Sequence, residues 1–408
     1  MKQIPGGITA AKGFRAAGLR AGIKPTSPAD KNDLGLLVSD VSCAAAGVFT
    51  TNRVKAAPVW LDKEQLANGT AQAVIVNSSI ANACAPEGNE TCQRELELVS
   101  DALQIAPSDV LVSSTGVIGV RLNVEAIEAA LPELVGKLAA TPEASDALAT
   151  AIMTTDTVKK EISYAFEVGG VTAHIGGVSK GSGMIHPQMG TMLCYLTTDA
   201  AVSSAMLDKA LRDVVGKTFN RISVDGDMST NDTCIVLANG LAGNACIAEA
   251  GEDYEAFRAA LYEVCLYLCR LMAKDGEGAS HLMTCEVSGA PDETTAEVLG
   301  KSVINSSLTK AAIFGADANW GRVLCAMGYA GVDFDPETVS VAFRSTKGSV
   351  LVCENGRGVD FSEETAKEVL LEEEVIIAID LHAGGASATC WGCDLTYDYV
   401  KINGDYRT

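Results

Sequence analysis

Short apolar runs alternate along the chain with segments whose apolar residues recur at helical spacing. Runs rich in β-branched and aliphatic residues predict strands at AQAVIVN (71–77), TMLCYLT (191–197), TCIVLANG (233–240), SVAFR (340–344), EVIIAIDL (374–381) and the alternating LTYDYVKI (395–402). Two helices are predicted by stripes of apolar residues, one at Ile127, Leu131, Leu134 and Leu138 after Asn123, the other from Phe257 through Leu261, Cys265, Leu268 and Met272 to Lys274 and Gly276. Since neither a fixed-period repeat nor a low-complexity linker interrupts this alternation, we expect layered sheets covered by helices.

Clusters of small and polar residues interrupt the pattern in five places. Gly, Asn, Asp and Ser are turn residues for reasons unrelated to function, so each cluster taken alone is read as a turn. Five in one chain, several rich in Thr and Asn, point to something more than turns. They are NSSIANAC (77–84), SSTGVIG (113–119), KGSGMIHPQMGT (180–191), SVDGDMSTNDT (223–233) and FGADANWGR (314–322).

Composition and charge narrow the classes of function. The chain has 408 residues, of which 48% are hydrophobic, so it is long enough for one large core or two ordinary ones. Its formal net charge of -21 repels phosphate backbones and anionic lipid, so we expect no nucleic-acid or membrane partner. An anionic substrate must therefore meet a local positive site. No apolar run has the length of a signal peptide or a membrane span, which predicts a soluble cytoplasmic protein.

Thirteen cysteines are scattered through apolar segments, the usage of reduced and buried thiols. Cys265 and Cys269 are spaced for one helix face. Cys390 and Cys393 form a CxxC pair, but no second pair or histidine cluster with zinc spacing accompanies it. We interpret the pair as structural, with a redox or metal role as the alternative, and expect no metal site.

The usual nucleophile motifs are missing. The four histidines stand in no recognisable triad order, and neither a GxSxG elbow nor a GxxxxGK[ST] phosphate loop is present. A threonine can act without histidine if its own α-amine, freed by chain cleavage, serves as the base. An α-amine has a pKa of about 7.7 to 8.0 and reaches its own hydroxyl. Thr191 after Gly190 fits this scheme, although from the residues alone the pair is one Gly-Thr among many turns.

Several longer motifs carry a family resemblance. KGSGMIHPQMGTML, SSTGVIG, SVDGDMSTNDT, GADANWGRVLCAMGYAG and ATCWGCDLTYDYVKINGDYRT together resemble the ornithine acetyltransferase family, also called glutamate N-acetyltransferases, over essentially the whole chain. The resemblance implies self-cleavage between Gly190 and Thr191 into an N-terminal alpha fragment, 1–190, and a C-terminal beta fragment, 191–408, that fold together as one catalytic unit. Thr191 then takes the acetyl group of N2-acetylornithine and passes it to glutamate, giving ornithine and N-acetylglutamate for arginine biosynthesis.

The same resemblance implies an α/β (α+β) fold, an αββα sandwich similar to amino-terminal nucleophile hydrolases, and a heterotetramer of two alpha and two beta fragments. It requires no cofactor, although some relatives also accept acetyl-CoA as donor. Oxyanion donors are implied at the Thr115 hydroxyl and the Gly116 N–H, and substrate-binding residues at Thr154, Lys180, Thr191, Glu277, Asn403 and Thr408. Our hypothesis is that Lys180 and Glu277 pair with the charged ends of the ligand. Asn231 and Arg322 are expected to help shape the site, and Trp320 to belong to the core.

The sequence also departs from the family pattern. Relatives often read MIAPNMATML, NSGNANAC and GEGATK where this chain has MIHPQMGTML, NSSIANAC and GEGASH. His186 therefore replaces an apolar residue five positions before Thr191; we interpret it as a surface histidine, with tuning of the nucleophile's amine as the alternative. Two rival functions stay open. One is an autoprocessed amidohydrolase or aminopeptidase in which water takes the acyl group, and the other is an uncleaved, non-catalytic binding protein.

Overall fold

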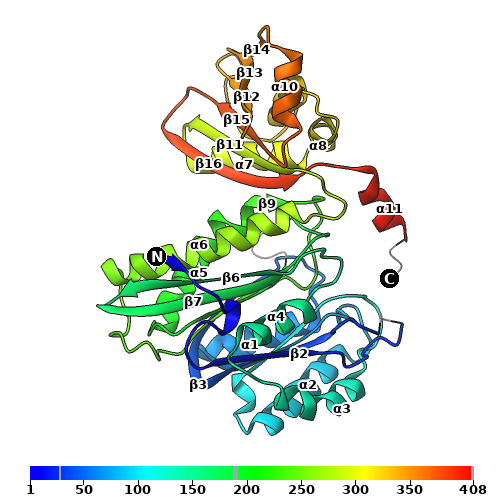
Figure 1. The fold of residues 1–408 in the computed structure, drawn as a ribbon, viewed down its shortest axis with the longest axis vertical. Helices are drawn as coiled ribbons and strands as arrows, with labels where there is room; N and C mark the ends of the chain where they lie inside the picture. The colour runs from blue at the N-terminus through cyan, green and yellow to red at the C-terminus, as the bar shows by residue number, and fades with distance from the viewer. Residues whose placement is uncertain (27–28, 187–191, 406–408) are drawn as a thin grey trace.

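Two sheets organise the chain, and helices cover both (Figure 1). The computed structural model describes residues 1–26, 29–186 and 192–405. Within these ranges nine strands form the first sheet, in the order β1-β6-β7-β8-β10-β3-β4-β5, and β2 pairs with β3. They are β1 (Lys2–Gln3), β2 (Phe14–Leu19), β3 (Leu34–Phe49), β4 (Thr70–Asn77), β5 (Val110–Ser114), β6 (Lys160–Val168), β7 (Val171–Lys180), β8 (Leu193–Thr198) and β10 (Thr233–Ala238).

The second sheet comprises seven strands of the described chain, in the order β14-β13-β12-β15-β11-β16-β9. Its members are β9 (Ile222–Ser223), β11 (Leu282–Ala290), β12 (Ser340–Ser345), β13 (Gly348–Glu354), β14 (Arg357–Gly358), β15 (Glu374–Asp380) and β16 (Ala386–Cys393). The helices of the whole fold are α1 (Ala57–Gln65), α2 (Gly88–Leu103), α3 (Val124–Gly136), α4 (Pro142–Ala151), α5 (Ser204–Lys217), α6 (Glu252–Lys274), α7 (Glu293–Asn305), α8 (Ser307–Phe314), α9 (Trp320–Gly328), α10 (Glu363–Leu370) and α11 (Tyr397–Asp405).

The first sheet doubles over on itself through the long strand β3. Alternate side chains of β4 enter two different cores, as the two-residue period of a strand requires. Ala73 and Ile75 pack against helices α2 and α3. Val74 and Val76 pack against the other half of the sheet, where Tyr195 of β8 joins the same core. Helices α5 and α6 cover the outer face of that second half. The layers therefore run helix, sheet, sheet, helix, which confirms the predicted αββα sandwich (Figure 1).

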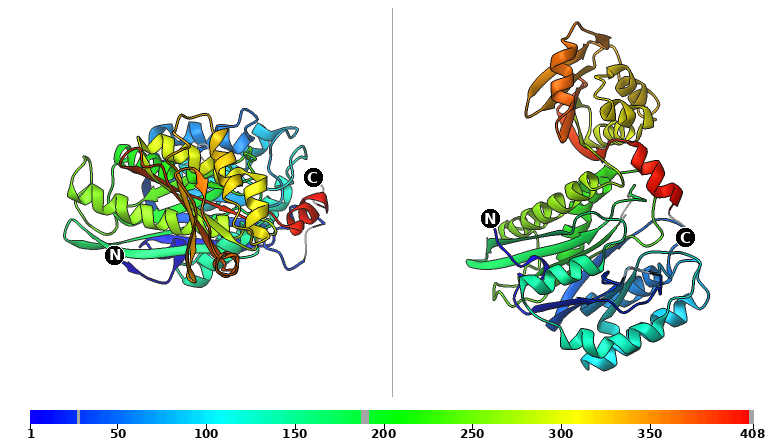
Figure 2. Two further views of the ribbon diagram at one scale, coloured as in Figure 1. Left: turned by 90° about the horizontal axis from the view of Figure 1, so that it is seen from above. Right: turned by 45° about the vertical axis from the view of Figure 1, so that its right-hand side comes forward.

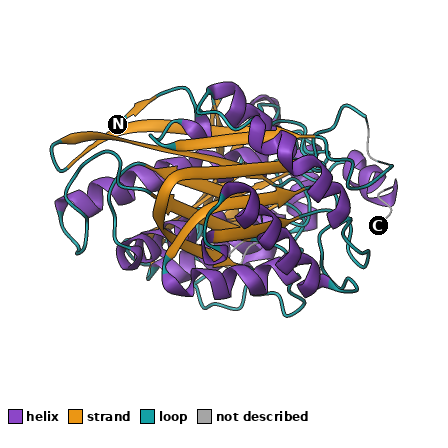
Figure 3. Ribbon diagram, turned by 90° about the horizontal axis from the view of Figure 1, so that it is seen from below, coloured by secondary structure: helices purple, strands orange, loops and turns teal. Residues whose placement is uncertain are grey.

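The second sheet forms a separate lobe above the sandwich (Figures 1 and 2). Its core is closed by helices α7, α9 and α10. Seen from below, the molecule as a whole has strands through its middle and helices around them (Figure 3). Helix α6 links the lobes, because its buried stripe packs against both the first sheet and Trp391 of β16. The apolar residues predicted for this stripe, from Phe257 to Met272, are all buried.

One predicted strand is wrong. A strand is expected over residues 395–402, but residues 397–402 belong to helix α11 (Tyr397–Asp405) instead. The side chains of Tyr397 and Val400 are 85% and 68% exposed, so the apparent alternation has no sheet face to cover. Strand β16 ends at Cys393, and Thr396 then turns the chain away by donating a hydrogen bond to the Gly278 carbonyl (2.6 Å). Tertiary contacts, and not periodicity, decide this element.

The CxxC pair does not act as a unit in the fold. Cys390 packs in the core of the second lobe, whereas Cys393 packs in the core around α6, since residues three apart in a strand point to opposite faces. All thirteen cysteines are free thiols, and burial raises the pKa of Cys390 to about 12. The structural interpretation of this pair is the one the packing supports.

Strands from both sides of residue 190 share the first sheet. β8 lies between β7 and β10, and β10 in turn pairs with β3. A chain cut between residues 190 and 191 would thus leave two fragments joined by main-chain hydrogen bonds on two sides. The fragment boundary itself stays a prediction.

Candidate active site

Most of the predicted site residues meet at one cavity. Its volume is about 210 Å³, and it lies where the ends of β5, β7 and β8 approach the loop that follows α6. Six predicted residues line it: Thr115, Gly116, Thr154, Lys180, Glu277 and Asn403. Their segments are far apart in the sequence, so the fold and not local structure brings them together. Gly190, Thr191 and Thr408 lie outside the described residues, although Met192 lines the cavity.

Lys180 ends strand β7, and its ammonium group reaches the loop that follows β5. Lys180 Nζ lies 3.4 Å from Thr115 Oγ1. A lysine ammonium has no acceptor and can only donate, so the Thr115 hydroxyl accepts this bond and keeps its own hydrogen for another partner. Burial lowers the pKa of Lys180, while the nearby Asp156, Asp232 and Glu277 act in the opposite direction.

Gly116 occupies a position that no other residue fits. Its φ is 123°, in the region that only glycine adopts readily, and a Cβ placed there would lie 2.3 Å from the Ser79 carbonyl oxygen. The close approach holds the Gly116 backbone against the segment after β4 (Thr70–Asn77). It also explains why a glycine follows Thr115 in this loop.

A buried ion cluster that the sequence did not predict lies next to Lys180. Lys160 is fully buried, and its Nζ lies 2.7 Å from Asp156 Oδ1 and 2.5 Å from Asp275 Oδ2. Asp156 also accepts a hydrogen bond from the Gly181 N–H (2.8 Å). Burial alone would raise the pKa of Asp156, but Lys180, Lys160 and this N–H hold it at about 2. The cluster thereby fixes the backbone next to Lys180. Asp156 and Asp275 each lie two residues from a predicted site residue, Thr154 and Glu277, yet their pairing with Lys160 has no local signal.

Two carboxyl groups, those of Glu277 and Asp232, also line the cavity. Glu277 is 9% exposed, and its Oε2 accepts a hydrogen bond from Asn403 Nδ2 (2.8 Å), which ties α11 to the site. A Cβ at Gly183 would lie 2.4 Å from this carboxylate, so a glycine is needed for Glu277 to approach. Asp232 is also buried at the cavity wall, and one of its oxygens has no hydrogen-bond partner among the described residues. Burial raises the pKa of Asp232 well above its usual range.

Both ends of the segment around Gly190 and Thr191 are anchored at this cavity. On one side, Asp225 accepts hydrogen bonds from the N–H groups of Met184 (2.7 Å) and Ile185 (3.0 Å). On the other side, the Met192 carbonyl accepts one from the Thr233 N–H (2.7 Å). Leu193 then stands opposite Lys180 in the sheet. Residues next to Thr191 in sequence are thus held beside Lys180.

The remaining candidates divide between the cavity and the rest of the fold. Asn231 lines the cavity and donates to the Ala81 (2.6 Å) and Ser114 (2.8 Å) carbonyls, as expected for a residue that shapes it. Arg322 is in α9, donates to the Leu308 carbonyl (2.9 Å) and does not line the cavity. His186 is partly buried, contacts Ser223 Oγ (3.2 Å) and is not a lining residue either. Trp320 packs against the core of the second lobe.

Within the described part of the chain, no three His, Cys, Asp or Glu side chains gather closely enough to hold a metal ion. Nor does any described helix combine the length and apolar character needed to span a bilayer.

A layered α/β fold with a small polar cavity, lined by hydroxyls, a lysine and carboxyls, defines a class of protein that acts on small charged molecules. The chain belongs to the ArgJ family, whose family model matches residues 15–408. It is 50% identical over 409 residues, covering 100% of both chains, to the arginine biosynthesis bifunctional protein ArgJ of Caldanaerobacter subterraneus subsp. tengcongensis.

Two solved structures are also similar. The crystal structure of the arginine biosynthesis bifunctional protein argJ from Bacillus halodurans is 43% identical with a TM-score of 0.50, and the match covers 52% of this chain and 98% of that chain. The ornithine acetyltransferase from Mycobacterium tuberculosis, solved in complex with ornithine, is 39% identical with a TM-score of 0.42, and the match covers 45% and 95% of the two chains.

Proposed function

We propose that this protein is an acyltransferase of arginine biosynthesis that moves an acetyl group from N2-acetylornithine to glutamate. Thr191, freed by cleavage after Gly190, is the proposed nucleophile. The observation that carries the proposal is the convergence of Thr115, Gly116 and Lys180 with three other predicted site residues on a single cavity that Met192 also lines.

The length of a solved relative supports the cleavage step. The match to the Bacillus halodurans structure covers 52% of this chain but 98% of the solved one, so the solved chain is about half as long. Cleavage between residues 190 and 191 would likewise divide this chain near its middle. β8 would then begin two residues after the new N-terminus, and its pairing with β7 and β10 would keep that terminus in place.

In the proposed reaction, Thr191 Oγ attacks the acetyl carbonyl carbon while the α-amine of Thr191 accepts the hydroxyl proton. The C–N bond to ornithine breaks, and that proton leaves on the ornithine nitrogen. Glutamate then attacks the threonine ester through its neutral α-amine. The ester C–O bond breaks, and Thr191 Oγ regains a proton by way of the α-amine. Acetyl, electrons and protons balance without a cofactor, and acetyl-CoA could supply the acetyl group in place of N2-acetylornithine.

Each tetrahedral intermediate carries an oxyanion that needs donors in fixed positions. Gly116 offers its backbone N–H and Thr115 its hydroxyl. Because Lys180 donates to Thr115 Oγ1, the hydroxyl hydrogen of Thr115 is left for the oxyanion. The positive charge of Lys180 also suits the carboxylate of either amino-acid substrate, and Glu277 suits an ammonium group. The heterotetramer of two alpha and two beta fragments belongs to the proposal as well.

Product analysis tests the proposal. Purified protein is incubated with N2-acetylornithine, with and without glutamate, and ornithine, N-acetylglutamate and acetate are quantified. The first turnover can release one ornithine per site without glutamate. Beyond that turnover, we expect ornithine to form only when glutamate is present and in the same amount as N-acetylglutamate. Ornithine and acetate formed steadily without glutamate would instead identify an amidohydrolase. Absence of any product would favour the non-catalytic alternative.

A further inference from the structure

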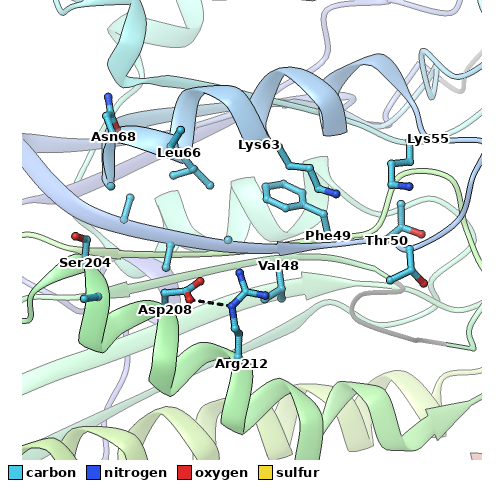
Figure 4. Close-up of a pocket in the computed structure, with 17 residues that line it drawn as sticks. Val48, Phe49, Thr50, Lys55, Lys63, Leu66, Asn68, Ser204, Asp208 and Arg212 are labelled. Atoms are coloured by element: carbon cyan, nitrogen blue, oxygen red, sulfur yellow. Dashed lines mark hydrogen bonds and ion pairs between the residues drawn. The ribbon is translucent and has the colours of Figure 1, made fainter. Parts of the chain in front are cut away.

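A second and larger groove lies next to the cavity of the candidate site. This groove has a volume of about 840 Å³ and runs between helices α1 and α5, with strand β3 as its floor (Figure 4). Thr50 lies at its end and donates a hydrogen bond from its N–H to the carbonyl of Asp232 (2.9 Å), a residue of the cavity wall. The two hollows are thus neighbours that share no lining residue.

Positive charge is concentrated in this groove. Lys55, Lys63 and Arg212 line it, and Asp208 is the one acidic residue among its described lining residues. Asp208 is already engaged, because its Oδ2 lies 2.8 Å from Arg212 Nε. Two positive charges therefore remain uncompensated in a chain whose formal net charge is -21. An anion is the natural counterpart of such a cluster.

Lys63 is the clearest unsatisfied group. It forms no hydrogen bond or ion pair with any described residue and instead rests near the rings of Phe49 (5.7 Å to the ring centre) and Trp60 (5.9 Å). Burial and the repulsion of Lys55 and Arg212 together lower the pKa of Lys63. Lys55 and Arg212 thus both lie close enough to Lys63 to repel its charge. Figure 4 shows Lys63 and Arg212 reaching toward the same stretch of β3 from opposite sides.

The floor of the groove adds main-chain donors. Pairing of β3 with β4 stops at Ala44, opposite Thr70, while pairing with β10 continues to Phe49. The Thr50 N–H points toward β10, whereas the Ala45 N–H points to the other side, to the Gly69 carbonyl (2.9 Å). Since successive residues of a strand direct their N–H groups to opposite sides, those of Gly47 and Phe49 point away from β10 into the groove, where no described strand pairs with them.

We propose that this groove binds the phosphate groups of a small phosphorylated molecule. Lysine ammonium groups, an arginine with a free guanidinium end and outward main-chain N–H groups are the donors that phosphate oxygens accept. The groove has room for more than a single phosphate, and Phe49 supplies an apolar wall beside the cations. The proposal is independent of the acetyl-transfer function, because no residue of the candidate site takes part in it.

Calorimetric titration with pyrophosphate tests the site on the full chain at low ionic strength. The key variant is Lys63→Met, which keeps the packing on Phe49 and Trp60 but removes the charge. The matched control is Lys137→Met, which removes the same charge from a half-exposed lysine just after the C-terminal end of α3 that pairs with Glu133. Unfolding midpoints of both variants establish that each is folded.

We expect saturable binding of one pyrophosphate per chain to the wild type. Lys63→Met should weaken it by about tenfold or more, as loss of a charge-assisted contact does, while Lys137→Met leaves it unchanged. Added salt should weaken the wild-type binding. Three results would overturn the proposal: absence of saturable binding, equal weakening by the two variants, or binding of a poly-glutamate peptide in the groove with no binding of pyrophosphate.

Discussion

Replacing Glu95 by glutamine should stabilise this protein, and increasingly so as the pH rises. Glu95 lies on α2 in the core between the helices and the first sheet, fully buried, and neither of its carboxyl oxygens has a hydrogen-bond partner among the described residues. Burial, with a further contribution from the nearby Asp62, raises the pKa of Glu95 to about 8. The native protein therefore keeps this carboxyl protonated at neutral pH.

The size of the effect follows from the two pKa values of this group. In the unfolded chain Glu95 ionises near its ordinary pKa of 4.5, whereas in the native state it ionises near 8. Between these values the unfolded state binds fewer protons than the native state, so the free energy of unfolding falls as the pH rises. At about 1.4 kcal/mol per pKa unit, the penalty is about 1 kcal/mol at pH 5 and about 4 kcal/mol at pH 8. Glutamine has no such penalty.

Urea unfolding of the wild type and of Glu95→Gln at pH 5 and pH 8 measures this difference. The gain from the substitution should grow by about 3 kcal/mol between the two pH values. Glu97→Gln, on the same helix but with a half-exposed side chain, serves as the control and should change stability by less than about 0.5 kcal/mol at either pH. A gain from Glu95→Gln that does not depend on pH would refute the reasoning.

Three further predictions concern the candidate site. Lys180→Met should raise KM for both substrates by about tenfold or more in steady-state acetyl-transfer assays, since each loses a charge-assisted contact; unchanged KM values would exclude Lys180 from substrate binding. Gly116→Ala should lower kcat about a hundredfold by displacing an oxyanion donor. Gly136→Ala should leave kcat unchanged, because a Cβ at Gly136 meets nothing within 4 Å and its φ is not positive; equal losses would contradict the assignment. Lys160→Met should lower the free energy of unfolding by about 3 to 5 kcal/mol, because it removes the ammonium group that pairs with two buried carboxylates. Lys159→Met, at the half-exposed neighbour, should cost less than about 1 kcal/mol; similar losses in urea unfolding would count against the buried cluster.

The sequence predicted those elements whose apolar pattern matches the surface they bury. The stripe from Phe257 to Met272 faces two sheets, and the apolar run of β4 serves two cores, so both patterns are strong. The strand predicted at residues 395–402 is wrong because the alternating apolar side chains there are not buried against a sheet. Contacts of Thr396 and Asn403 with the loop after α6 instead determine helix α11.

The candidate active site likewise contains some residues that the sequence predicted and others that it did not. Thr115, Gly116 and Lys180 could be named because they stand in recognisable motifs. The ion cluster of Lys160, Asp156 and Asp275 could not, since Lys160 and Asp275 are 115 residues apart and only the fold brings them together. The cluster of cations in the groove between α1 and α5 could not be predicted from the sequence either, because Lys63 and Arg212 belong to separate helices without any shared motif.

The most direct test of the proposed function is the intact mass of the denatured protein after brief incubation with N2-acetylornithine alone. We expect two fragments whose masses sum to the full chain plus one water, the C-terminal one beginning at Thr191 and carrying a single acetyl group. An uncut chain, or a cut chain that never carries the acetyl group under rapid quenching, would contradict the assignment of Thr191 as the nucleophile.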